Sequence, residues 1–122
     1  MRRTPVYLLL PLTLAAQAPH VDYARDVHPI LATRCFACHS GDKRSGGLSL
    51  SAYEDVLQGG RSGAAIVPAD AKNSLLMLRV TGENAPRMPI GGSPLAPQEI
   101  AALRSWIDEG ARRAPNTPPA KP

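Results

Sequence analysis

The chain has 122 residues, with 14 Lys and Arg against 10 Asp and Glu, and its formal net charge is +4. This length suits at most one domain and excludes a two-domain enzyme. With 2 Cys and 20% charged residues, the composition also excludes a disulfide-rich miniprotein and a polytopic membrane protein. Only 4% of the residues are aromatic, so a folded core must use aliphatic side chains or a group that is not protein.

The first 18 residues have the pattern of a secretory signal peptide. Two arginines are followed by a mostly apolar run over 6–16, and an Ala-Gln-Ala sequence ends at Ala18. We therefore expect cleavage near Ala18 and a mature chain that works outside the cytoplasm, in a bacterial periplasm, without a transmembrane segment. The run is shorter than the roughly 20 residues of a spanning helix, and its retention as an N-terminal anchor is the alternative.

The expected folded unit is 21–110, and the last residues, 111–122, are expected to be a Pro-rich disordered tail. The segment from Arg112 to Pro122 contains four Pro and three basic residues and shows no apolar periodicity. Such a segment does not bury enough apolar surface to offset the entropy lost on ordering.

Within the folded unit the pattern predicts an all-α fold of about four short helices. Capping residues and glycine stops define the first three. The predicted caps, in chain order, are Asp26 before a helix with Pro29 in its first turn, a capping box over 51–54, and Asp70. The predicted stops of the second and third helices are Gly59-Gly60 and Gly82.

The fourth helix has the clearest pattern. Pro97 suits its first position and Glu99 its third, and Gly110 is its expected stop. Apolar residues at 100, 103, 106 and 107 repeat at spacings of three and four, which places them on one face. Leu95 and Ile100 are placed to form a hydrophobic staple, whereas Ala96 stands at the cap position, where Ser or Thr is usual.

The sequence Cys35-Phe36-Ala37-Cys38-His39 is a C-x-x-C-H motif. This spacing is typical of covalent haem attachment, with thioether bonds from Cys35 and Cys38 and with His39 as an axial iron ligand. One such motif predicts one haem c. A flat apolar group of this kind would also account for the shortage of aromatic residues.

Three other interpretations of the two cysteines are less favoured. A disulfide between Cys35 and Cys38 would close so small a ring that it would stabilise little. A thioredoxin-like pair needs a strand–helix–strand context, which the pattern does not show. A zinc site would need further ligands, and the other candidates are only His20 and His28.

The second axial ligand is predicted to be Met88. It lies in a loop with proline on both sides and no helical period, where a methionine has no packing role. Met77 lies in a helical apolar run and is more typical of a core residue. Met77, a histidine (His20 or His28) or an open coordination site are the alternatives.

The motifs together resemble class I cytochromes c and, more closely, the planctomycete-type cytochrome c domain. The resembling segments are 21–27, 35–39, 46–50, 65–68, 74–76, 87–89 and 100–107. The resemblance implies N- and C-terminal helices that cross over a haem ligated by His39 and Met88. It also implies that a backbone carbonyl near Gly46-Gly47 orients the second ring nitrogen of His39.

The apolar residues expected around the haem are spread over the folded unit. They are Leu48, Leu50, Ile66, Leu75, Leu78, Ile90, Leu103 and Ile107. Phe36 and Trp106 supply the large rings, either as haem contacts or as ordinary core.

The expected function is single-electron transfer by a His/Met-ligated haem, because a six-coordinate iron has no open position for a substrate. The chain is then an electron-transfer protein and not an enzyme, or the electron-entry domain of a larger oxidoreductase system, and its partners are redox proteins. The alternative is a ligand-binding, sensor or peroxidase-like haem with a displaceable distal ligand. Nucleic acid is not an expected partner. The folded unit 21–110 has 9 Lys and Arg against 10 Asp and Glu, so the net positive charge belongs to the two ends.

Overall fold

The fold was analysed in a computed structural model, which describes residues 1–2, 5–8, 11 and 20–122. The predicted cleavage site for the signal peptide, at 16–18, lies outside the described residues. Within the described part of the chain, no helix is both long enough and apolar enough to cross a membrane.

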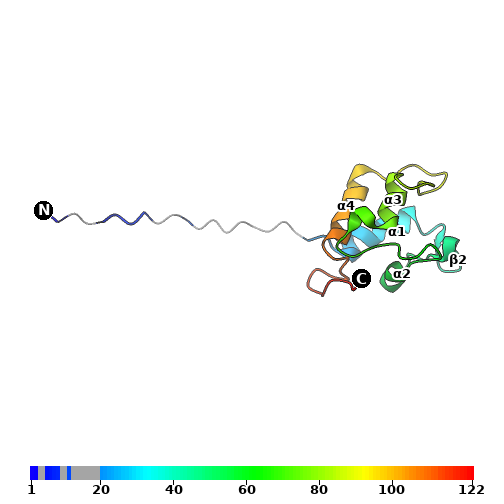
Figure 1. The fold of residues 1–122 in the computed structure, drawn as a ribbon, viewed down its shortest axis with the longest axis horizontal. Coiled ribbons are helices and arrows are strands. Elements are labelled where there is room, and N and C mark those ends of the chain that lie inside the picture. Colours follow the sequence, from blue (N-terminus) through cyan, green and yellow to red (C-terminus); the bar gives the residue numbers. More distant parts are fainter. Residues whose placement is uncertain (3–4, 9–10, 12–19) are drawn as a thin grey trace.

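Four α-helices and one small hairpin make up the folded part (Figure 1). The helices are α1 (His28–Arg34), α2 (Tyr53–Gln58), α3 (Leu75–Thr81) and α4 (Pro97–Asp108). A π-helical turn η1 (Tyr23–Val27) leads into α1, and short 3-10 turns η2 (Ser45–Gly47) and η3 (Ala71–Asn73) precede α2 and α3. The fold is therefore mostly helical, as the sequence predicts.

The two short strands depart from the predicted all-α class. β1 (His39–Ser40) pairs antiparallel with β2 (Lys43–Arg44), so that His39 lies opposite Arg44. Two-residue strands are too short to produce a period-2 pattern, which explains why the sequence gives no sign of them. The hairpin begins at the histidine of the C-x-x-C-H motif.

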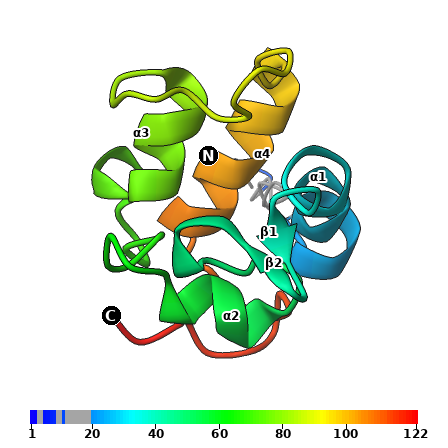
Figure 2. The ribbon, with the colours of Figure 1, turned by 90° about the vertical axis from the view of Figure 1, so that its right-hand side faces the viewer.

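Helix α4 lies between α3 and α1 in Figure 2 and packs against both α3 and η1. Its predicted inner face is buried, since Leu103, Trp106 and Ile107 are at most 2% exposed. Pro97 is its first residue, as predicted, and the Glu99 carboxylate accepts a 2.8 Å bond from the backbone N–H of Ala96. This bond is the half of a capping box that the third helical residue supplies, while the half supplied by a Ser or Thr side chain at the cap position is absent.

The predicted caps of the first three helices are wrong, although the glycine stops at 59 and 82 are confirmed. The helical segment begins at Tyr23, three residues before Asp26. Its cap is Asp22, whose side chain accepts the N–H of Arg25 while the Asp26 side chain accepts the N–H of Asp22, at 3.0 and 2.9 Å. The cap positions of α2 and α3 are held by Ala52 and Ser74, and Asp70 precedes η3 without a side-chain cap bond. Ser51 instead bonds the hydroxyl of Ser49 at 3.0 Å.

The C-terminal segment packs on the domain, which differs from the detached tail that its composition predicts. Ala111 is fully buried, and its carbonyl accepts a 2.8 Å bond from the hydroxyl of Tyr53 in α2. The carbonyl of Arg112 accepts a 2.8 Å bond from the Trp106 indole. Arg113 pairs with Glu54 and lies 4.5 Å from the centre of the Tyr53 ring. Two backbone carbonyls and one cation thus find partners on α2 and α4, which the proline content does not reveal.

Candidate functional site

The C-x-x-C-H motif forms a tight turn at the end of α1. Cys35 is the C-cap of α1, and its N–H donates to the carbonyl of Leu31 at 2.8 Å. The carbonyl of Cys35 accepts the N–H groups of Cys38 and His39, at 3.2 and 2.9 Å. His39 is fixed further because its carbonyl accepts the N–H of Leu50 at 2.7 Å. The turn therefore presents the first thiol and the imidazole on the same side of the chain.

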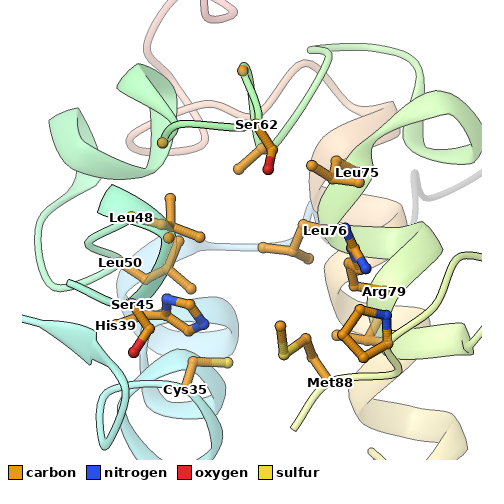
Figure 3. A pocket seen from close by; sticks show the side chains of 16 residues that line it. Cys35, His39, Ser45, Leu48, Leu50, Ser62, Leu75, Leu76, Arg79 and Met88 are labelled. Carbon is orange, nitrogen blue, oxygen red and sulfur yellow. The ribbon is translucent and has the colours of Figure 1, made fainter. Parts of the chain in front are cut away.

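That side faces a cavity with two adjoining parts of about 220 and 410 Å³. Both parts are lined by Cys35, His39, Ser45, Gly46, Val80 and Met88, so they lie on either side of the same residues. Leu48 and Leu50 cover one wall, and Leu75 and Leu76 of α3 cover the opposite wall (Figure 3). The combined size is within the range of small-molecule and cofactor sites.

The side chains of His39 and Met88 point into this cavity from opposite sides (Figure 3). His39 comes from the motif turn, and Met88 comes from the loop between α3 and α4. The two residues are far apart in the sequence, and the structure brings them to one space together with Cys35. Cys38 lines the larger part of the cavity and is exposed.

The alternative axial residues do not line the cavity. Met77 is 1% exposed and belongs to the hydrophobic core, as its helical position predicts. His28 lies edge-on to Tyr23 and Phe36, with ring centres 6.0 and 5.5 Å away. His20 lies 3.7 Å from the carboxylate of Glu109.

One ring nitrogen of His39, Nδ1, is buried and has no hydrogen-bond partner among the described residues. The carbonyl expected to orient it from Gly46 instead accepts the backbone N–H of Arg61 at 2.8 Å. That expectation is therefore not met in this structure. The His39 side chain nevertheless lines the cavity, where an imidazole is suited to binding a group placed in it.

The state of the cysteines does not support the other thiol chemistries. Cys35 and Cys38 are not joined in a disulfide. Burial raises the pKa of the Cys35 thiol to about 11, and a protonated thiol is a poor nucleophile for disulfide exchange. Among the described residues, no cluster of three or more His, Cys, Asp or Glu side chains is arranged to hold a metal ion. Cys35 is therefore described as a free thiol at the edge of an apolar cavity.

The predicted apolar surroundings are correct in part. Leu48, Leu50 and Leu75 line the smaller part of the cavity, and Ile90 lines the larger part, although Ile90 is 68% exposed. The other predicted contacts do not line either part; these are Ile66, Leu78, Leu103 and Ile107. Phe36 and Trp106 also lie outside the lining, and both belong to the core and its edge.

Sequence reasoning missed several lining residues, of which Leu76, Arg79 and Val80 on α3 are the most consequential. Their spacing of three and four residues places them on one helical face. Leu78, which the sequence predicts as a contact on the same helix, does not line the cavity. Arg79 is also the one charged side chain that lines the smaller part of the cavity.

Comparison with known proteins places the site in a family context. Residues 35–89 match the model of the family described as planctomycete cytochrome C. The chain is 34% identical over 132 aligned positions to hydrazine synthase subunit alpha of Kuenenia stuttgartiensis, covering 83% of this chain and 16% of that protein. A solved structure of hydrazine synthase from the same organism is similar, with a TM-score of 0.55 and 32% identity over 83% of this chain and 17% of that chain. The chain therefore spans about a sixth of the relative that it matches.

Proposed function

We propose, because residues 35–89 match the model of the planctomycete cytochrome C family, that the chain is a single-haem c-type cytochrome that transfers electrons one at a time outside the cytoplasm. The observation that carries the proposal is the convergence of Cys35, His39 and Met88 on one apolar cavity.

In this proposal Cys35 and Cys38 hold the haem through thioether bonds, and His39 and Met88 bind its iron. The bound haem would supply a metal centre that alternates between the ferrous and ferric states by gaining or losing one electron. The chain contributes the axial ligands and the apolar walls. Leucines on both sides of the cavity exclude water, and an apolar environment of this kind disfavours the more highly charged ferric centre.

The two methionines of the folded part give a matched test of the ligand assignment. We expect Met88→Leu to abolish the weak long-wavelength absorption that sulfur ligation gives to ferric haem, because Met88 lines the cavity. Met77→Leu is the control, since this side chain is 1% exposed in the core and does not line the cavity. Persistence of the band in Met88→Leu would show that Met88 is not the ligand.

Carbon monoxide distinguishes electron transfer from the alternative of a ligand-binding or sensor haem. A ferrous iron held by both His39 and Met88 has no free position, so we expect slow and incomplete binding at neutral pH. Met88→Leu should bind the gas rapidly. Rapid, complete binding by the unaltered protein would favour the sensor-type alternative.

The similarity to a hydrazine synthase subunit favours a role beside other redox proteins. Because this chain spans only 16% of that subunit, we propose an electron-handling domain and assign it no catalytic chemistry of its own. Its partners would then be redox proteins that exchange electrons with the haem.

A further inference from the structure

The loop that carries Met88 joins the end of α3 to the start of α4, over residues 82–96. Met88 belongs to no helix or strand, so the position of the loop decides whether the Met88 sulfur faces His39. Beyond the helix cap at Gly82, two backbone bonds attach its first half to α3: the N–H of Asn84 donates to the carbonyl of Leu78 at 3.0 Å, and the N–H of Met88 donates to the carbonyl of Arg79 at 2.9 Å.

Arg79 holds the first half of this loop twice. Besides accepting the N–H of Met88 through its carbonyl, it donates from its guanidinium to the carbonyl of Ala85. The residue lies on the face of α3 that lines the cavity. One residue of a helix therefore fixes the chain both at Met88 and three residues before it.

Arg34 holds the second half of the loop. Its Nη2 atom donates to the carbonyls of Ser93 and Pro94, at 2.7 and 2.8 Å. From 89 to 95, these are the only hydrogen bonds in the described part of the chain that attach the loop to another element. Its Nε atom also lies 3.9 Å from the carboxylate of Glu99, at the start of α4.

The position of Arg34 in the sequence explains why its contacts with the loop matter for the site. Arg34 is the last residue of α1 and directly precedes Cys35. Its bonds therefore join the element that carries the cysteines and His39 to the loop that carries Met88. Its side chain is only 24% exposed, and a guanidinium with several donors in one plane suits two neighbouring carbonyls.

We propose that Arg34 and Arg79 are positioning residues that hold the Met88 loop closed over the cavity, and so control how readily an external ligand replaces Met88. This inference rests on the proposed function, because it takes Met88 as an iron ligand. Neither arginine would touch the iron. Each acts by lowering the fraction of molecules in which the loop is open.

Imidazole binding to the ferric holoprotein measures that fraction. An external ligand binds only the open form, so its apparent affinity rises in proportion to the population of that form. Loss of charge-assisted hydrogen bonds worth about 1.5 kcal/mol or more corresponds to about a tenfold change. We therefore expect Arg34→Gln and Arg79→Gln each to raise the apparent association constant of imidazole about tenfold.

Three controls separate positioning from general destabilisation. Arg104→Gln removes an exposed arginine of α4 that makes none of these contacts, and it should leave imidazole affinity unchanged. Leu103→Ala should lower the melting temperature without changing imidazole affinity, because Leu103 is buried but does not line the cavity. Arg34→Lys keeps a charged donor and should restore part of the wild-type behaviour.

The outcomes are distinguishable. If imidazole affinity in Arg34→Gln, Arg34→Lys and Arg79→Gln equals that of the unaltered protein, the inference is overturned. The same holds if Leu103→Ala raises the affinity as much as they do. If Arg34→Gln does not take up haem, then Arg34→Lys and Arg79→Gln decide. If the unaltered ferric protein lacks the sulfur-to-iron absorption, it is the proposed Met88 ligation that fails.

Discussion

Replacement of tyrosine by phenylalanine should affect the stability of the protein differently at two positions of one aromatic cluster. Tyr23 and Tyr53 lie edge-on, with ring centres 5.3 Å apart, and both contact Trp106. The hydroxyl of Tyr53 donates to the buried Ala111 carbonyl at 2.8 Å. The hydroxyl of Tyr23 is buried without a hydrogen-bond partner in the described structure. Substitution by phenylalanine removes one oxygen in each case.

Tyr53→Phe should destabilise the protein, because it removes a hydrogen bond and leaves the carbonyl of a fully buried residue without its donor. The expected loss is about 1–2 kcal/mol in the free energy of unfolding. For a domain of this size, each 1 kcal/mol lowers the melting temperature by about 4–8 °C. Tyr23→Phe removes a hydroxyl that gains nothing in the folded state, so stability should be unchanged or slightly higher.

Guanidinium chloride unfolding followed by fluorescence measures both variants, since Trp106 is the only tryptophan and contacts both rings. The midpoint should fall for Tyr53→Phe alone, with an unchanged slope. Equal losses for the two variants, or no loss for Tyr53→Phe, would refute the reasoning. The latter result would also show that the C-terminal segment is not attached to α2 in solution.

Two further predictions concern the core and the acid limit of stability. Leu103→Ala should lower the free energy of unfolding by about 2–5 kcal/mol, because Leu103 is 1% exposed in the centre of α4; a loss below about 1 kcal/mol in denaturant unfolding would contradict this packing. The hydrogen bond from Arg25, with the N–H of Asp22, lowers the pKa of the Asp26 carboxyl from 3.8 to about 2. Its stabilising contribution is therefore present above pH 3.8 and lost as the pH falls to about 2. Melting temperatures between pH 2 and 5 should depend less steeply on pH in Asp26→Asn, and parallel curves for the two proteins would refute this.

The sequence is most informative where local rules and packing agree. Helix α4 is predicted with its first residue, its buried face and its N-terminal glutamate, because Pro97, Glu99 and the apolar period all indicate the same element. The start of the first helical segment is misplaced. Asp22 and Asp26 both suit a cap, and only the structure shows that they act as a reciprocal pair around one turn.

The C-terminal segment shows a limit of composition. Its prolines predict a tail, yet Ala111 and Ala120 pack against the core. The partners of this segment are Tyr53, Trp106 and Glu54. Tyr53 and Glu54 are distant from this segment in the sequence, so no local pattern reports their contacts with it.

The residues of the candidate site were likewise predictable from the sequence only in part. The C-x-x-C-H motif and the isolated Met88 are visible in the sequence because few other roles explain them. The roles proposed for Arg34 and Arg79 are not visible in the sequence, since their hydrogen bonds go to backbone carbonyls of the loop. Such acceptors have no side-chain signature. The positioning role proposed for these two arginines can therefore be inferred only from the path of the loop in the folded structure.

Intact-mass measurement under denaturing conditions tests the central claim most directly. The protein should be produced by export in a host that attaches haem c, and compared with its Cys35→Ser/Cys38→Ser variant. The account predicts that the unaltered chain retains the mass of one haem after denaturation and that the variant retains none. An unaltered chain that carries two unmodified cysteines, or a haem that leaves on denaturation, would contradict covalent attachment at Cys35 and Cys38.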